Sequence, residues 1–197
     1  MKEISVKGTA RTKFGKKAAY DIRKANGVPC NLYGEAKDEN GLPVAVPFTV
    51  TNDELRNLIY TPDIYLVNLD IDGKAHKAVL KELQFHPVKD NVLHVDFYEV
   101  NDTKPIVMEV PIKLNGLAEG VKAGGRLAAS VRKLKVKAVY SQIPERLNID
   151  VTNLALGKTI KVGELHFEGL ELVTNKEVVV CQVKMTRGAR SAAAAEN

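Results

Sequence analysis

The chain has 197 residues, of which 45% are hydrophobic and 27% charged, as is typical of a soluble globular protein with one or two domains. No apolar run reaches the roughly 18 residues that a membrane-spanning helix needs, and the N-terminus lacks the hydrophobic segment of a secretory signal. Cys30 and Cys181 lie far apart in apolar runs. We therefore expect buried thiols and no disulfide or metal site, in a cytoplasmic protein.

The net charge of +5 is concentrated at the N-terminus. Residues 1–30 carry eight Lys or Arg and two acidic residues, a net charge of +6, whereas the remaining 167 residues have a net charge of −1. Positive charge concentrated in this way attracts polyanions and speeds their association. We expect a polyanionic partner, although a simply solvated basic end gives the same pattern.

The first half of the chain alternates strands with two short helices. Residues 9–17 form a basic, glycine-containing loop, and residues 17–26 have apolar positions at helical spacing before Gly27. Thr51 begins a capping box that opens a second helix to about residue 60. Strands are expected at 4–6, 28–34, 44–50, 65–71, 74–85 and 92–98, with turns at 37–41 and 72–73. This order with short connections predicts a small closed or nearly closed β-barrel.

The last of these strands carries polar side chains of three kinds. Because side chains alternate between the two faces of a strand, one face is predicted to line the core with Leu93, Val95 and Phe97. The other face then presents an imidazole, a carboxylate and a phenol in a row, from His94, Asp96 and Tyr98. A solvated outer face is the alternative interpretation of this row.

The character of the sequence changes at residues 101–105, a polar break that we interpret as a domain boundary. Strict alternation then predicts strands, and a glycine-rich loop with positive φ is expected at 119–126. These strands are placed at 106–114, 131–140, 147–151, 170–173 and 178–185. The strand at 131–140 has three lysines on one face, Lys133, Lys135 and Lys137.

The fold class predicted from these patterns is mainly β with a few short helices. A small β-barrel is expected in residues 1–100 and a second, mostly β domain in residues 101–187. Residues 188–197 have little to bury, and we expect a disordered tail.

Catalytic and metal-binding signatures are weak. His86, His94 and Asp96 have a spacing compatible with a metal site, but no fourth ligand stands in register. The chain has no G-x-S-x-G nucleophile elbow, and the glycine-rich loop lacks the Gly-Lys-Ser/Thr ending of a phosphate-binding loop. We therefore expect no enzyme, cofactor or metal, and metal analysis of the purified protein would test the alternative of a metal-dependent hydrolase.

RNA binding agrees better with the pattern. The basic loop at 11–17 can lie across phosphates, and each phosphate that it neutralises adds salt-dependent affinity. Asp96 can accept hydrogen bonds from base amino groups or 2′-hydroxyls, which RNA displays in its shallow minor groove. A carboxylate facing RNA is costly beside phosphates, so Asp96 is predicted to read a donor on a base edge.

Several motifs resemble a family of large-subunit ribosomal proteins that bind 5S ribosomal RNA. In the first hundred residues these are Arg11-x4-Lys16, the helix with Arg23, Val28-Pro29-x3-Tyr33-Gly34 and His86-Pro87-x6-His94-x-Asp96-Phe97. Residues 101–187 resemble the C-terminal domain of the longer, Ctc-type (general stress protein) members. The motifs there are Gly120-Val121-x-Ala123-Gly124-Gly125-x-Leu127 and Ile143-Pro144-Glu145-x2-Asn148-Ile149-Asp150-Val151.

The resemblance implies an N-terminal β-barrel that binds 5S rRNA in the 50S subunit, as a cytoplasmic, monomeric and structural protein. The RNA contacts that it implies are Arg11, Lys16, Arg23, Tyr33, His94 and Asp96. The sequence departs from the family at Tyr20 and Asp21, where short members carry arginines, and we expect Lys17 to supply part of that charge. The C-terminal domain is expected beside neighbouring ribosomal proteins or 23S rRNA. A sequence-tolerant RNA-binding stress factor that works off the ribosome is the alternative function.

Overall fold

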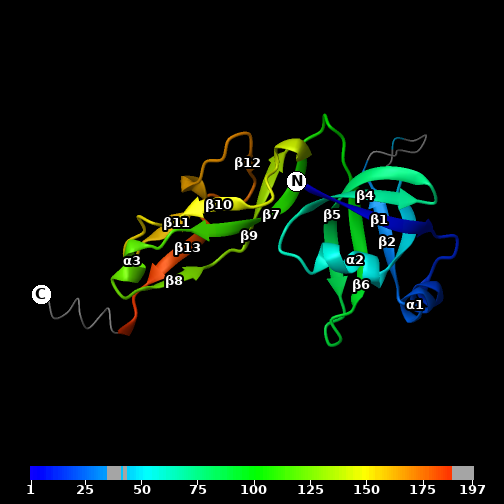
Figure 1. The fold of residues 1–197 in the computed structure, drawn as a ribbon, viewed down its shortest axis with the longest axis horizontal. Coiled ribbons are helices and arrows are strands. Elements are labelled where there is room, and N and C mark those ends of the chain that lie inside the picture. The colour runs from blue at the N-terminus through cyan, green and yellow to red at the C-terminus, as the bar shows by residue number, and fades with distance from the viewer. Residues whose placement is uncertain (35–40, 42–43, 188–197) are drawn as a thin grey trace, which may run out of the picture. The chain divides into compact units, whose positions relative to one another are not determined.

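The computed structural model describes residues 1–34, 41 and 44–187. It divides into two compact units (Figure 1). Unit 1 contains residues 1–106 with 139–141, and unit 2 contains residues 107–138 and the chain from 142 onward. The tail expected at 188–197 and, apart from Gly41, the turn expected at 37–41 lie outside the described residues.

Unit 1 has the predicted order of strands and helices. Its helices are α1 (Lys16–Lys24) and α2 (Asn52–Ile59). Its strands are β1 (Lys2–Ala10), β2 (Gly27–Tyr33), β3 (Val46–Thr51), β4 (Tyr65–Ile71), β5 (Lys74–Phe85) and β6 (Val92–Glu99). β1 extends through Ala10, although a loop was expected from Thr9 onward. It is longer because it pairs with a distant strand, β4, from Lys2 to Gly8, and with β3 at Thr9 and Ala10.

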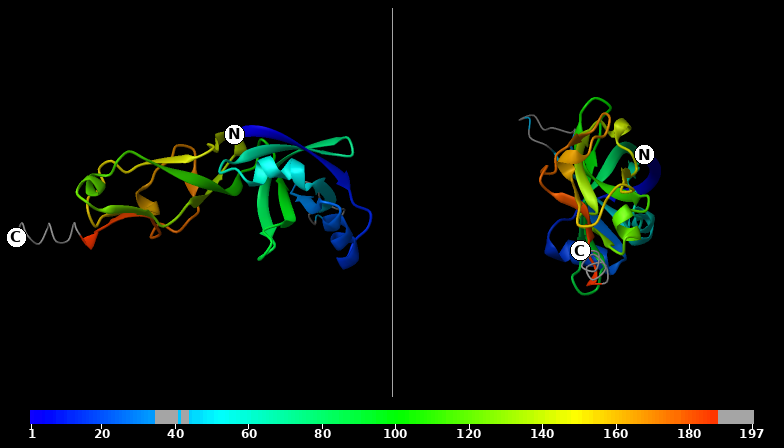
Figure 2. Two further views of the ribbon diagram at one scale, coloured as in Figure 1. Left: turned by 60° about the horizontal axis from the view of Figure 1, so that its bottom comes forward. Right: turned by 90° about the vertical axis from the view of Figure 1, so that its left-hand side faces the viewer.

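The six strands close into a barrel in the order β1-β3-β2-β6-β5-β4, so the predicted barrel is confirmed (Figures 1 and 2). Two of the neighbouring pairs are parallel, β1 with β4 and β2 with β6, and the other pairs are antiparallel. Closure gives every strand of the barrel a partner on both sides, which leaves little sheet edge for pairing with another chain. It also brings β2 and β6, which are about sixty residues apart in the chain, into direct register.

The inward-facing side chains of the barrel strands make one apolar core. Phe48 and Phe97 lie at its centre with ring centroids 5.7 Å apart, and both are fully buried. Leu55 and Leu58 of α2 join this core, so α2 closes part of the barrel interior. Burial of each such side chain contributes about 1.5–3 kcal/mol to the free energy of unfolding.

The helix termini differ in detail from the sequence prediction. Thr51 is the N-cap of α2, as predicted, but its side chain makes no capping hydrogen bond, so the predicted capping box is not formed. α1 packs on β2 through Ile22, and this close contact requires a glycine at position 27. A Cβ at Gly27 would lie only 2.9 Å from Ile22 Cγ2 and 3.0 Å from Thr49 Cγ2.

Unit 2 is also mostly β. One of its sheets has the order β10-β7-β9-β12, from β7 (Ile106–Asn115), β9 (Lys133–Ala138), β10 (Leu147–Asp150) and β12 (Glu171–Leu172). The other has the order β11-β13-β8, from β8 (Arg126–Ala129), β11 (Thr159–Lys161) and β13 (Val179–Lys184). A 3₁₀ turn occupies Val162–Glu164, and a second, Tyr140–Gln142, begins in the short segment 139–141 that belongs to unit 1. The mainly β fold class is confirmed. Within the described residues, no helix is both long and apolar enough to cross a membrane.

The glycine-rich motif of unit 2 serves packing. Residues Glu119–Lys122 form a short helix, α3, where only a loop was predicted, and Gly124 has the expected positive φ of 85°. A Cβ at Gly120 would lie 2.6 Å from the backbone nitrogen of Leu156, and one at Gly125 would lie 2.5 Å from the Leu156 side chain. The motif therefore lets two backbone segments pack against each other without intervening side chains.

We predict that Gly120→Ala destabilises unit 2 selectively, by about 1–3 kcal/mol, because the added methyl group meets backbone atoms that cannot rotate away. Residue-resolved hydrogen exchange during urea titration measures each unit separately. Gly163→Ala is the comparison and should destabilise less, since its Cβ would lie 3.2 Å from Lys176 Cβ and 3.3 Å from Lys176 O, farther than the 2.6 Å contact at Gly120. Equal stability of Gly120→Ala and the wild type would contradict this packing role.

Candidate nucleic-acid interface

Strand β6 carries the polar row that the sequence singled out. Val95 and Phe97 are fully buried in the barrel core, as predicted. His94, Asp96 and Tyr98 alternate with them and are only partly buried. Leu93 is an exception to the prediction, because it is only partly buried and Val92 takes the core position instead.

The exception has a local cause in the pairing of β6 with β5. Gln84 pairs with His94 but Phe85 pairs with Val92, so Leu93 is an extra residue, a β-bulge. A second irregularity between Leu80 and Glu82 makes Lys81 the extra residue on β5. The two bulges explain why two residues, rather than one, separate the inward-facing apolar positions at Leu80 and Leu83 and at Val92 and Val95. Bulges are over-represented beside functional sites because they redirect side chains.

Neighbouring strands extend the row into a surface that we call the polar face. β2 is parallel to β6 and places Asn31 beside Asp96 and Tyr33 beside Tyr98. β5 is antiparallel to β6 and places Glu82 opposite Asp96 and Gln84 opposite His94. The polar face thus consists of Asn31, Tyr33, Glu82, Gln84, His94, Asp96 and Tyr98. Asn31, Glu82 and Gln84 were not found from the sequence, because only the pairing of distant strands brings them to β6.

Specific contacts fix side chains on the polar face. His94 Nδ1 lies 3.4 Å from Asp96 Oδ1, and both side chains are 22% exposed, so they are held in place yet reachable. The rings of Tyr33 and Tyr98 meet edge to face, with centroids 5.8 Å apart and planes at 77°. Burial raises the pKa of Tyr33, and the nearby carboxylates of Asp96 and Glu82 raise it further. The phenol is therefore a hydrogen-bond donor at neutral pH.

The carboxylates of Asp96 and Glu82 make the centre of the polar face acidic. They stand directly opposite each other on β6 and β5, an arrangement of like charges that is unfavourable in an isolated sheet. Neither carboxylate has a cationic partner from Lys or Arg among the described residues. Two acceptors in this position are suited to hydrogen-bond donors of a ligand, such as amino or hydroxyl groups.

The basic loop and α1 supply cations on the same barrel. The backbone N–H of Arg11 donates to Pro47 O on β3, and its guanidinium lies over the ring of Phe14, with Cζ 5.7 Å from the centroid. Its Nε is buried and has no hydrogen-bond partner in the described part of the chain. Arg11 Nη2 donates to Lys13 O at 3.3 Å, so the loop holds both the backbone and the guanidinium of Arg11 in place.

Lys16 and Lys17 occupy the first turn of α1, where Gly15 is the N-cap and no acidic residue is present. The positive end of the helix dipole repels cations there, by about 0.3–1 kcal/mol each. Both side chains are exposed, and within the described residues neither has an ion-pair partner. An external anion would compensate this arrangement.

Arg23, in the last turn of α1, reaches the bulge of β6. Its Nε and Nη2 donate hydrogen bonds to Leu93 O, at 3.0 and 2.8 Å. The resemblance implied an RNA contact for Arg23, and nothing in the sequence indicated these hydrogen bonds. The hydrogen bonds connect α1 to the strand that carries His94 and Asp96.

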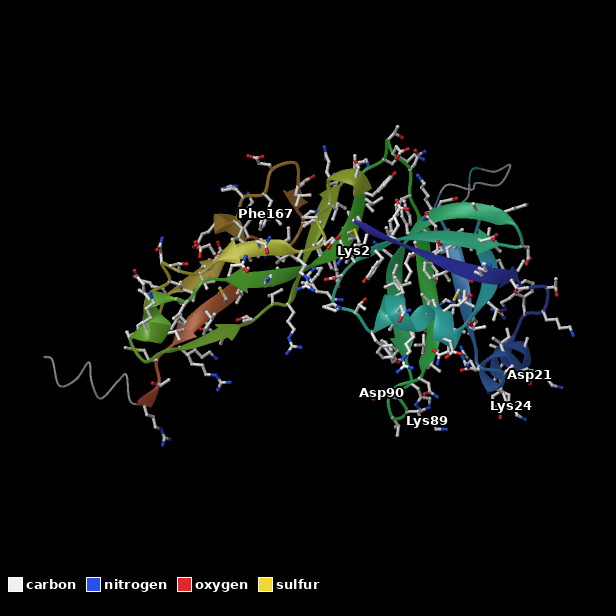
Figure 3. All side chains as sticks on the ribbon, viewed as in Figure 1. Lys2, Asp21, Lys24, Lys89, Asp90 and Phe167 are labelled. Carbon is white, nitrogen blue, oxygen red and sulfur yellow. The ribbon has the colours of Figure 1, made fainter. Side chains whose placement is uncertain are left out.

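The alternative metal site is not assembled. His86 Nδ1 accepts hydrogen bonds from the backbone N–H groups of Val88 and Lys89, at 3.2 Å each, and so holds the loop between β5 and β6 together. Figure 3 shows Lys89 and Asp90 at the tip of this loop, and Asp21 and Lys24 on α1. No group of three or more metal-ligating side chains occurs in the described residues. The structure gives His86 a role in shaping the loop.

The lysine face of unit 2 is real but partly neutralised. Lys133, Lys135 and Lys137 are exposed on β9, while the residues between them are buried as predicted. Lys135 Nζ lies 3.9 Å from Glu109 Oε1, and Lys137 Nζ lies 3.3 Å from Glu171 Oε2. The strands on either side therefore reduce the positive charge of this face.

Comparisons with known proteins cover both units. The model of the ribosomal L25p family matches residues 6–97, and that of the ribosomal protein TL5 C-terminal domain matches residues 105–187. The chain is 66% identical over 194 residues to the large ribosomal subunit protein bL25 of Phocaeicola vulgatus, covering 98% of each chain. It is 62% identical over 200 residues to the protein of that name from Bacteroides thetaiotaomicron, covering 99% of this chain and 98% of the relative. The Porphyromonas gingivalis protein of that name is 58% identical over 194 residues, with 98% of each chain covered.

Cys30 lies directly behind the polar face and offers a test of its integrity. Burial raises its pKa to about 12, and the charge of Asp96 raises it as well. The reactive thiolate at pH 8.5 is then roughly a thousandfold rarer than in the unfolded chain. We predict that Cys30 in a Cys181→Ala background resists iodoacetamide at pH 8.5 and reacts fully in urea, as mass spectrometry will show. Rapid alkylation of the native protein would mean that the barrel opens behind the face.

Proposed function

The chain belongs to the ribosomal L25p family, and from this premise we propose that its barrel binds 5S rRNA within the large ribosomal subunit. The relatives are named as proteins of the large ribosomal subunit. The role of this chain is structural and not enzymatic, as an RNA-binding component of the cytoplasmic ribosome in translation. The finer statement, that the RNA is 5S rRNA and that the polar face contacts it, rests on the arguments that follow.

The observation that carries the proposal is the pair of outward-facing carboxylates together with the exposed lysines of α1 on the same barrel. A phosphate backbone would be repelled by Asp96 and Glu82 but attracted by Lys16 and Lys17. The two groups therefore have different roles in binding. The cations contact phosphates and position the protein on the RNA backbone, and the polar face recognises base edges and 2′-hydroxyls in the groove.

The minor groove of RNA displays groups that the polar face can bind. It is wide and shallow, and it displays 2′-hydroxyls and base edges, so a sheet surface can lie against it. The carboxylates accept from amino or hydroxyl groups, while His94 and Tyr33 can donate. A distorted helix that exposes unusual base edges would be recognised in preference to a regular one.

The residues proposed to contact the RNA are Arg11, Lys16, Lys17, Arg23, Tyr33, His94 and Asp96. We add Asn31 and Glu82, which the register places beside Asp96. Residues 1–100 form the RNA-binding domain in this proposal. Residues 101–187 form a second domain in contact with neighbouring ribosomal proteins or 23S rRNA, for which Lys133 is available on β9. One copy of the chain per particle suffices.

A gel-shift comparison tests the proposal directly. The full chain is titrated against 5S rRNA and against an unrelated structured RNA of the same length at the same salt concentration. We expect tighter binding to 5S rRNA. Equal affinity for both RNAs would contradict the proposed specificity and would instead indicate a general RNA-binding protein.

We predict that Asp96→Asn weakens binding to 5S rRNA by about 1–3 kcal/mol and leaves the weaker binding to unrelated RNA nearly unchanged. The substitution preserves the shape of the side chain but removes one acceptor and its charge. If Asp96→Asn instead strengthened binding to both RNAs, the carboxylate would be a source of repulsion and not a reader of donors.

Lys16→Ala, in contrast, is predicted to affect both RNAs alike. It should weaken binding to both RNAs and reduce the slope of log K against log salt by about one, because one phosphate contact is lost. Lys74→Ala, an exposed lysine at the start of β5, is the control and should change neither quantity. The same response from Asp96→Asn and Lys16→Ala would contradict the division of work between the two groups.

A further inference from the structure

The guanidinium of Arg23 is held along one edge only. Nε–H and one Nη2–H donate to the same acceptor, Leu93 O, at 3.0 and 2.8 Å. A guanidinium has five N–H donors in a rigid plane, so three remain, on Nη1 and on the far side of Nη2. Arg23 as a whole is exposed. Two of the remaining N–H groups, one on each Nη, form a second fork along the neighbouring edge of the guanidinium.

The acceptor is an unusual carbonyl. Leu93 is the extra residue of the β6 bulge, and the pairing of β6 with β2 begins only at Val95. A bulged residue falls outside the regular ladder, which makes its backbone groups available to a side chain. Arg23 takes up this acceptor from seventy residues earlier in the chain.

We propose that Leu93 O is a buttress that presents the outer edge of Arg23 to one backbone phosphate of the bound RNA. The inference rests on the proposed function and adds a site to it. Because Leu93 directly precedes His94, the phosphate bound by Arg23 lies at a fixed distance from the groups that Asp96 and His94 read. The bulge thereby sets the spacing between a positioning contact and a reading contact.

The chemistry requires arginine. Two parallel N–H groups match two phosphate oxygens, and the carbonyl on the adjacent edge fixes the plane of the guanidinium in advance. A lysine at this position keeps the positive charge. Its ammonium is a point donor on a flexible chain, however, and cannot hold the carbonyl and a phosphate fork in one plane.

The first experiment measures binding of 5S rRNA to the full chain at several salt concentrations for three variants. We expect Arg23→Lys to lose about tenfold in affinity at fixed salt although its charge is unchanged. Arg23→Ala should lose more and reduce the salt slope by about one. Arg56→Lys on α2, an exposed arginine of the same unit, is the matched control and should bind like the wild type.

The outcomes separate the inference from the function on which it rests. A wild-type protein that does not prefer 5S rRNA contradicts the proposed function and, because the inference rests on it, the phosphate site as well. A wild-type preference with Arg23→Lys equal to the wild type overturns the buttress alone. A wild-type preference with an unchanged salt slope in Arg23→Ala shows that Arg23 binds no phosphate, which also overturns the inference.

A second measurement does not depend on any variant. The Nε–H signal of Arg23 in ¹⁵N NMR spectra should be protected from exchange in the isolated protein and stay protected after RNA is added, while the signals of its Nη groups shift. Loss of Nε–H protection on RNA binding would show that Arg23 leaves the carbonyl, and would refute the buttress.

Discussion

The register of β6 between β2 and β5 is the constraint on which the rest of the barrel surface depends. β6 runs parallel to β2 and antiparallel to β5, and a bulge on each of β5 and β6 offsets the pairing by one residue and then restores it. Without those bulges, strict alternation would turn Glu82 inward in place of Leu83. With them, Leu83, Val95 and Phe97 contribute to the core, while both carboxylates face outward.

The charges of unit 1 are separated on the fold in a way that suits a polyanion with readable donors. Lysines at the start of α1 lie at the positive end of the helix dipole, which is unfavourable for the isolated protein. The carboxylates of Glu82 on β5 and Asp96 on β6 face each other on adjacent strands, and this repulsion is also unfavourable for the isolated protein. Local conflicts of this kind are expected where a surface is shaped for a ligand rather than for stability. Arg23 joins the two regions by its hydrogen bonds to Leu93 O.

Unit 2 shows how a motif that looks functional can be structural. The glycines at 120 and 125 look like a phosphate-binding loop only in composition. In the fold Gly120 allows the backbone at 155–156 to approach closely, and Gly125 leaves room for the side chains of Leu156 and Val183. The lysines of β9 look like a basic RNA-binding stripe, but Glu109 and Glu171 on the neighbouring strands lie close to two of them. Exposed pairs of this kind contribute little to stability, so their main effect is on the surface potential.

The sequence by itself determined the order of strands and helices, the barrel, the burial of Cys30, Val95 and Phe97, and the outward row of His94, Asp96 and Tyr98. These follow from local periodicity, which depends only on neighbours along the chain. Tertiary structure alone decided that Asn31 and Glu82 flank Asp96, that Val92 replaces Leu93 in the core, and that Arg23 bonds to Leu93 O. Each of these depends on pairing or packing between segments far apart in the chain. Periodicity carries no information about such a partner, because one strand pattern is compatible with many registers.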